Sequence, residues 1–239
     1  MEKLRIGSRT QLGGRIRTVG LVARRRGPRS AERYAVTTAD LEPLLRDEGC
    51  RAGIHSSRLI AALPVEAPIG PPADGLCTIG PLAGVEDLVN EVIRRFHPER
   101  GRIQGTVTAL RGAAQLRVGD SSLLVRELVE IRFLERESGA EADSPVLESA
   151  DSGALVTTWN GHVVGLLVAG SGHTGFVAPL RPFLEANRLI HCTVMRTTGT
   201  PFARVGLHAL ETEAGIASQV VEIERDGTFG LDVYLDEAA

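Results

Sequence analysis

The sequence predicts an all-β protein with a few short helices and a β extension at its C-terminal end. Most of the chain consists of short apolar segments separated by glycine, proline and polar turns, a pattern typical of β-sandwiches and β-barrels. Three segments instead have the apolar spacing of short amphipathic helices.

The composition limits the classes of partner. The 239 residues suffice for one large β domain or two small ones packed together. The chain is 43% hydrophobic and 24% charged, with a formal net charge of −3, an ordinary balance for a globular protein. Nucleic acid and anionic membranes are therefore not expected as partners. The longest apolar run, at 163–169, is too short to span a bilayer.

Residue usage favours a bacterial cytoplasmic protein without a cofactor. Lys3 is the only lysine in an arginine-rich chain, which suggests a GC-rich bacterial genome. Cys50, Cys77 and Cys192 are odd in number and far apart, so we expect reduced thiols. The segment 1–14 lacks the apolar stretch of a signal peptide. Clustered metal ligands, phosphate loops and dinucleotide fingerprints are missing, so neither a metal nor a cofactor is expected.

The strand candidates follow one another along the chain. They occupy 18–23, 33–38, 59–65, 76–82, 102–110, 113–118, 127–134, 152–159, 162–170 and 174–180. The first two flank an arginine-rich loop and form a predicted hairpin. A last hairpin is expected in 220–235, around Asp226 and Gly227.

The three predicted helices lie between these strands. The first spans 40–49, with Asp40 as its N-cap and Gly49 just past its end. The segment 85–96 has an apolar stripe at helical spacing, which predicts a bridging helix over 85–98. The third spans 182–189 and begins at a proline.

The segment around Ser152 carries the most specific motif. Ala150-Asp151-Ser152-Gly153 resembles the Gly-Asp-Ser-Gly nucleophile motif of trypsin-like (chymotrypsin-fold) serine peptidases, and 163–171 resembles the strand that flanks their substrate. Segments 100–110 and 78–82 are similar to further landmarks of the family.

The resemblance covers residues 5–188 and implies a double β-barrel. It divides the chain into a first barrel (1–84), the bridging helix (85–98), a second barrel (99–189) and the C-terminal β extension (190–239). In this family the first barrel supplies the catalytic histidine and aspartate, and the second supplies the serine.

The resemblance places unusual residues in both first-barrel positions. Asp40 occupies the histidine position, and a carboxylate titrates about two to three pH units below an imidazole, which makes it a weak base. The closest match to the aspartate motif puts Ile60 in the aspartate position, with Ser56 or Ser57 as alternatives. None of these three can orient an imidazole as a carboxylate does.

Two further features bear on activity. Ala150 replaces the glycine whose N–H joins that of Ser152 in binding the oxyanion. His55, in the first barrel, is the best candidate for an alternative base. His162, in a turn, is expected to point away from the cleft, and His173, after the substrate-flanking strand, is a candidate for lining a specificity pocket.

The leading hypothesis is an inactive trypsin-like peptidase homologue, in which Ser152 is an inherited turn residue. It would recognise a protein partner in a bacterial multi-component system. The alternative is an active serine endopeptidase with Ser152 as nucleophile, His55 as base and a protein substrate. A third hypothesis assigns the Arg24–Arg29 loop to an acidic partner; aromatic residues make up only 4% of the chain, which argues against nucleic acid.

Overall fold

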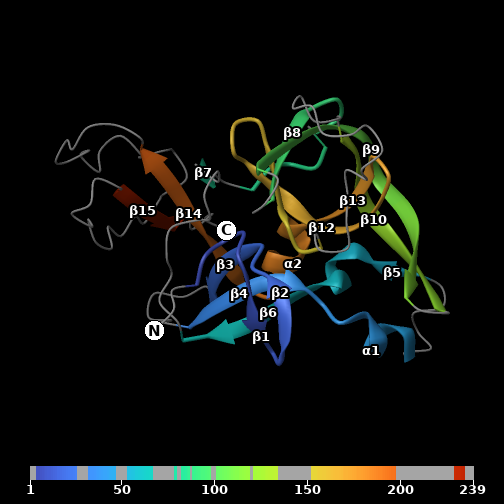
Figure 1. Ribbon diagram of the computed structural model, residues 1–239, viewed down its shortest axis with the longest axis horizontal. Helices are drawn as coiled ribbons and strands as arrows, with labels where there is room; N and C mark the ends of the chain where they lie inside the picture. The colour runs from blue at the N-terminus through green and yellow to red at the C-terminus, as the bar shows by residue number, and fades with distance from the viewer. Residues whose placement is uncertain are drawn as a thin grey trace.

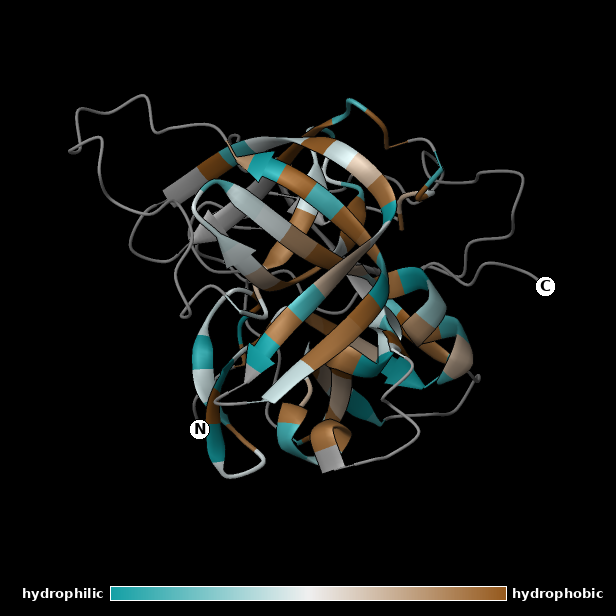
Figure 2. Ribbon diagram, turned by 90° about the vertical axis from the view of Figure 1, so that its right-hand side faces the viewer, coloured by the Kyte–Doolittle hydropathy of each residue, from teal (hydrophilic) through white to brown (hydrophobic). Residues whose placement is uncertain are grey.

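The computed structural model describes residues 4–25, 32–46, 53–66, 78–79, 82–86, 88–97, 101–118, 121–133, 152–197 and 229–234. Strands dominate these residues, with a few short helices, as predicted (Figure 1). Along the long strands hydrophobic and hydrophilic residues alternate (Figure 2), as expected for sheets with one face in a core.

Six strands of the C-terminal half form a closed barrel. They are β8 (Val92–His97), β9 (Gly101–Val118), β10 (Ser121–Phe133), β11 (Leu155–Thr158), β12 (Val163–Ser171) and β13 (Thr174–Pro179). They are hydrogen-bonded in the order β13-β12-β11-β8-β9-β10, and β13 also pairs with β10, which closes the circle. One hydrophobic cluster with side chains from all six strands forms its core.

The β9–β10 hairpin extends beyond this barrel. Arg111 and Glu127 adopt positive φ angles of 51° and 59°, and the ladder shifts register beside Glu127. Such irregularities bend a strand. The outer part of β10 pairs in parallel with β5 (Ile54–His55), and its Val125 packs into the hydrophobic core of the N-terminal half. The hairpin therefore belongs to both halves of the molecule.

The N-terminal half is built from a hairpin and a larger sheet. The hairpin joins β1 (Arg9–Leu12) to β2 (Arg15–Thr18). The sheet has the order β15-β14-β3-β4-β6, and β7 also pairs with β14. These strands are β3 (Leu21–Arg25), β4 (Arg33–Thr38), β6 (Ile60–Val65), β7 (Thr78–Ile79), β14 (Leu189–Thr197) and β15 (Phe229–Tyr234).

Strands β14 and β15 lie in the segment predicted as a C-terminal β extension, and β14 joins the sheet of the N-terminal half by pairing with β3. Most of the hairpin predicted around Asp226 and Gly227 lies outside the described residues. The predicted domain boundaries at 84, 98 and 189 stay predictions.

Two of the predicted helices are present. Helix α1 (Leu41–Arg46) directly follows Asp40, and α2 (Leu180–Ala186) begins two residues before Pro182. A 3-10 helix, η2 (Ser56–Leu59), connects β5 to β6. The helices within the described ranges are all too short and too polar to cross a membrane.

The predicted bridging helix over 85–98 is wrong, because Val92–His97 forms strand β8. A turn containing Asn90, whose φ is +63°, precedes it. The supposed helical stripe is divided: Leu88 is buried, whereas Val89 and Val92 are exposed. Strand β8 pairs with both β9 and β11, and this tertiary pairing overrides the local helical pattern.

Candidate functional site

Ser152 lies on a tight turn that leads into β11. The next residue, Gly153, has a φ of +89°, a conformation that favours glycine. Its N–H donates to the carbonyl oxygen of Leu167 at 2.7 Å. A Cβ at Gly153 would lie 3.3 Å from Thr18, a tight contact, so glycine lets the turn approach the end of β2 without a shift of its neighbours. The turn is thereby fixed against the N-terminal half.

Gly20 makes the matching approach from the N-terminal half. A Cβ at this position would lie 2.3 Å from a methyl group of Leu166 and 2.7 Å from the carbonyl oxygen of Gly153. The N–H of Gly20 donates to Val36 in β4 at 2.9 Å. The Ser152 turn therefore touches the chain that connects β2 to β3.

The end of β4 lies at the same place. Thr37 is buried, and its Oγ1 donates to the carbonyl oxygen of Thr18 at 2.8 Å. The adjacent Thr38 and Ser152 line one pocket. The resemblance places the family's histidine position, here Asp40, just after this strand.

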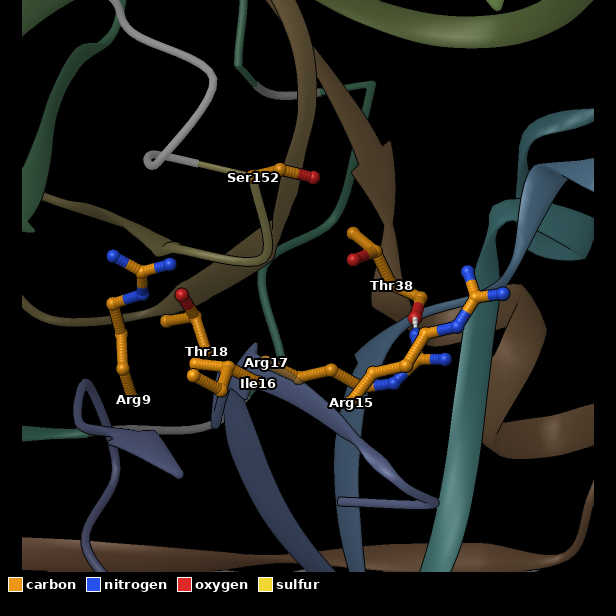
Figure 3. A pocket seen from close by; sticks show the side chains of 7 residues that line it. All are labelled: Arg9, Arg15, Ile16, Arg17, Thr18, Thr38 and Ser152. Atoms are coloured by element: carbon orange, nitrogen blue, oxygen red, sulfur yellow. Dashed lines mark hydrogen bonds between the residues drawn. The ribbon is translucent and has the colours of Figure 1, made fainter. Parts of the chain in front are cut away.

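This pocket has a volume of about 210 Å³ and a basic lining. It is lined by Arg9, Arg15, Ile16, Arg17, Thr18, Thr38 and Ser152. Arg9 lies on one side with Thr18, Arg15 and Arg17 extend toward the other, and Ser152 lies across from the hairpin (Figure 3). Among the described residues, three arginines, two threonines and one serine thus line the pocket.

Asp40 contacts the arginines of this hairpin. One carboxylate oxygen lies 3.0 Å from Nη1 of Arg15, and the other lies 2.7 Å from Nη2 of Arg17. Arg17 also donates through Nη1 to the carbonyl oxygen of Thr38 at 2.6 Å. The carboxylate of Asp40 therefore holds Arg15 and Arg17 in place, and Asp40 is not among the residues that line the pocket.

The candidates for the aspartate position have structural roles. Ile60 is buried in the core of the N-terminal half and is the β6 partner of Thr38. Ser56 is buried, and its hydroxyl donates to the carbonyl oxygen of Glu127 at 2.7 Å. Ser57 Oγ lies 2.8 Å from Nδ1 of His55.

His55 is engaged in its own turn. It is the N-cap of η2, and its Nδ1 accepts a hydrogen bond from the backbone N–H of Ser57 at 3.1 Å. Its side chain is exposed and lies outside the Ser152 pocket. His162 and His173 lie outside the pocket as well. Among the described residues, therefore, no imidazole lines the pocket beside Ser152.

Two predicted features can be described only in part. Ala150, the second predicted oxyanion donor, lies outside the described residues, as does most of the Arg24–Arg29 loop. Of its described residues, Arg25 pairs with Glu32 at 3.2 Å and donates to the hydroxyl of Tyr34 at 3.1 Å.

Sequence reasoning missed the arginines of the β1–β2 hairpin. Arg15 and Arg17 alternate along β2 and so share one face, while Arg9 is the cross-strand partner of Thr18 on the other face. The pocket therefore follows the edge of β2 and takes side chains from both faces. The alternating arginines at 15 and 17 were a readable signal, but only the fold brings them to Ser152.

Comparisons with known proteins support the fold and go no further. No family model and no curated protein matches the sequence. Protease A from Thermobifida fusca matches with a TM-score of 0.52 and 14% identity, over 80% of this chain and 98% of the protease. The Nocardiopsis protease matches with a TM-score of 0.54 and 15% identity, over 80% and 99%. The fold is thus the double β-barrel of chymotrypsin-like serine proteases, as predicted.

Proposed function

We propose that this protein is a catalytically inactive homologue of trypsin-like serine peptidases that recognises a protein partner. One observation carries the proposal. The described lining of the pocket beside Ser152 consists mainly of arginines and threonines. The end of β4, close to where the resemblance places the family's catalytic histidine, contributes Thr38 to this lining. The fold brings the two halves together at Ser152, but the groups that meet there differ from those of a peptidase.

The chemistry of these groups supports inactivity. A serine hydroxyl is a poor nucleophile until a neutral base accepts its proton. The guanidinium groups of Arg9, Arg15 and Arg17 only donate hydrogen bonds and stay protonated. Asp40, the residue in the histidine position, directs its carboxylate to Arg15 and Arg17. Proton transfer from Ser152 therefore lacks an acceptor of suitable basicity among the described neighbours.

The contacts of His55 weaken the alternative of an active endopeptidase. Its Nδ1 accepts from Ser57, so its use as a base would require the N-cap of η2 to be broken. Under that alternative, His55→Gln abolishes a proteolytic activity that the wild-type protein has. We expect no such activity to be present.

Labelling with a fluorophosphonate probe tests the proposal. The probe reacts with activated serines, so we expect no adduct that disappears in the Ser152→Ala variant. A trypsin-like protease in the same reaction shows that the probe is reactive. An adduct mapped to Ser152 by mass spectrometry would refute the inactive state.

The setting is part of the proposal. We infer a bacterial cytoplasmic protein acting in a multi-component system, supported by the three scattered cysteines and the arginine-rich composition. Titration of the denatured protein with a thiol reagent, without a reductant, is expected to find three free thiols. A disulfide would contradict the cytoplasmic setting and leave the proposed inactivity untouched.

A further inference from the structure

We propose that the pocket beside Ser152 is a binding site for an acidic peptide segment, whose carboxylates contact Arg9 on one side and Arg15 and Arg17 on the other. This proposal rests on the proposed role in protein recognition, because it names the chemistry of the partner at the same site.

The charge of the lining is the first argument. Among the described residues, three arginines line the pocket and no carboxylate does. Asp40 pairs with Arg15 and Arg17, and the carboxylate of Glu42 lies 4.0 Å from Nη2 of Arg15. In the described part of the chain, two carboxylates thus face three positive charges. Among the residues that the structure describes, none pairs with Arg9. The pocket therefore keeps net positive charge in a chain whose formal net charge is −3, and the attraction for an anion is local.

The second argument is that two of the arginine side chains are already held in place. Asp40 holds Arg15 and Arg17 from outside the pocket, and the carbonyl oxygen of Thr38 fixes Arg17 further. A guanidinium group that is held in place loses less conformational entropy when it binds a carboxylate. It also presents paired N–H groups that match the two carboxylate oxygens.

The third argument is the supply of hydroxyl groups between the arginines. Thr18, Thr38 and Ser152 line the same pocket, and hydroxyl groups both donate and accept hydrogen bonds. Among the described residues, none forms a hydrogen bond with the Ser152 hydroxyl. Under this proposal the Ser152 hydroxyl donates a hydrogen bond to the bound peptide segment.

Size and layout favour a peptide over a small anion or a cofactor. The volume of about 210 Å³ lies below the range of about 300–1,000 Å³ that is typical of small-molecule sites. The arginines flank the pocket from two sides (Figure 3), so they suit two separated carboxylates better than one compact phosphate. A run of acidic side chains in an extended segment has that form.

The test measures binding of a fluorescein-labelled peptide of six glutamates by fluorescence polarisation, with a peptide of six glutamines as the uncharged control. We expect the glutamate peptide to bind and the glutamine peptide not to bind. Added salt should weaken binding, because exposed charges are screened. Arg9→Gln and Arg15→Gln should each weaken it roughly five-fold, the effect of one exposed ion pair.

Arg25→Gln is the matched control. Arg25 lies on β3, the next strand along the chain, with a side chain 59% exposed, against 58% for Arg15. Its replacement changes the net charge equally. We expect Arg25→Gln to leave the affinity unchanged. Equal losses for Arg15→Gln and Arg25→Gln would show nonspecific charge attraction and overturn the site. Thermal unfolding checks that each variant is folded.

Competition experiments separate the ligand classes. Inorganic phosphate and a single-stranded oligonucleotide should displace the labelled peptide less effectively than unlabelled glutamate peptide at equal charge. Stronger displacement by either one would overturn the assignment to a peptide. Mass spectrometry of the bound peptide then distinguishes the two proposals. Cleavage of the peptide would refute the proposed inactivity and leave the binding site standing. An intact peptide whose affinity is unchanged by Arg9→Gln would refute the binding site alone.

Discussion

The two halves of the molecule differ in how they are closed. The six strands β8–β13 form a complete barrel with its own hydrophobic core. In the N-terminal half, which holds the first barrel, the described strands do not form one closed ladder. The β1–β2 hairpin is a sheet of its own, and no pairing between described strands closes the β15-β14-β3-β4-β6 sheet. That half is completed from outside, by β14 and by the β9–β10 hairpin.

This difference suggests which side chains can be replaced without loss of the fold and which cannot. The turn with Ser152 and Gly153 leads into β11 of the closed barrel. The φ angle of Gly153 favours glycine, and a Cβ there would make a tight contact with Thr18. Most of the described residues that line the pocket beside the turn come from the β1–β2 hairpin, which lies outside the larger sheet. Their side chains can change without breaking a core, so the fold can persist while the chemistry beside Ser152 changes.

The largest expected effect comes from truncating one isoleucine in each half. Ile131 is fully buried in the barrel, and Ile60 is buried in the open sheet. Isoleucine-to-alanine changes in cores cost about 2–5 kcal/mol, depending on how far the site collapses. We expect Ile131→Ala near the upper limit and Ile60→Ala near the lower one, measured by urea denaturation. Equal losses would contradict the contrast between a closed and an open half.

The next effect concerns the contact between the halves. In Gly20→Ala the new methyl group meets Leu166 at 2.3 Å and the backbone of Gly153 at 2.7 Å. Overpacking of this kind costs about 1–3 kcal/mol, so the free energy of unfolding should fall by that amount. The control is Gly14→Ala, because a Cβ there meets nothing within 4 Å, although its φ of +80° adds strain. A larger loss at Gly14 than at Gly20 would contradict the predicted contact.

A smaller effect is expected from Asp40, which links the hairpin to the end of β4. Asp40→Ala should lower the free energy of unfolding by about 1 kcal/mol, the upper limit for exposed ion pairs. Double-mutant cycles should give a larger coupling of Asp40 with Arg17 than with Arg15, because the side chain of Arg17 is only 11% exposed. The opposite order would show that burial does not strengthen this pair.

The smallest effect is expected from Ser152→Ala. Ser152 is half-buried, and its hydroxyl has no hydrogen-bond partner among the described residues, so the free energy of unfolding should change by less than about 0.5 kcal/mol. Chemical denaturation measures the difference. A loss above 1 kcal/mol would assign Ser152 a structural role in the turn.

The sequence was sufficient where local pattern and tertiary structure agree. The short segment at 33–38, predicted as a strand after the arginine-rich loop, forms β4. The Ser152–Gly153 motif marks a turn that the fold uses as predicted. The sequence prediction failed at 85–98, where the apolar residues have helical spacing. Part of this segment forms strand β8, because it pairs with β9 and β11 within the barrel. Helical spacing in a short segment cannot reveal a strand partner that is distant in the sequence.

The sequence predicted which elements meet at the candidate site but not the positive charge of its lining. Resemblance brought Ser152 and the end of β4 together, and the structure places Thr38 and Ser152 in one pocket. The arginines of the β1–β2 hairpin were not predicted, because they are spread along the sequence, whereas the arginines of the 24–29 loop are clustered. Arg25 of that loop is already paired with Glu32, so local density was a poor guide to available charge.

The pairing of β14 with β3 has a consequence for synthesis on the ribosome. Strand β3 ends at Arg25 and β14 begins at Leu189, so the N-terminal sheet lacks a neighbouring strand until most of the chain has been made. Contacts this distant in sequence slow folding, and unpaired strand edges promote aggregation. We therefore expect the barrel of β8–β13 to form first and to serve as the template on which the earlier-made half is completed.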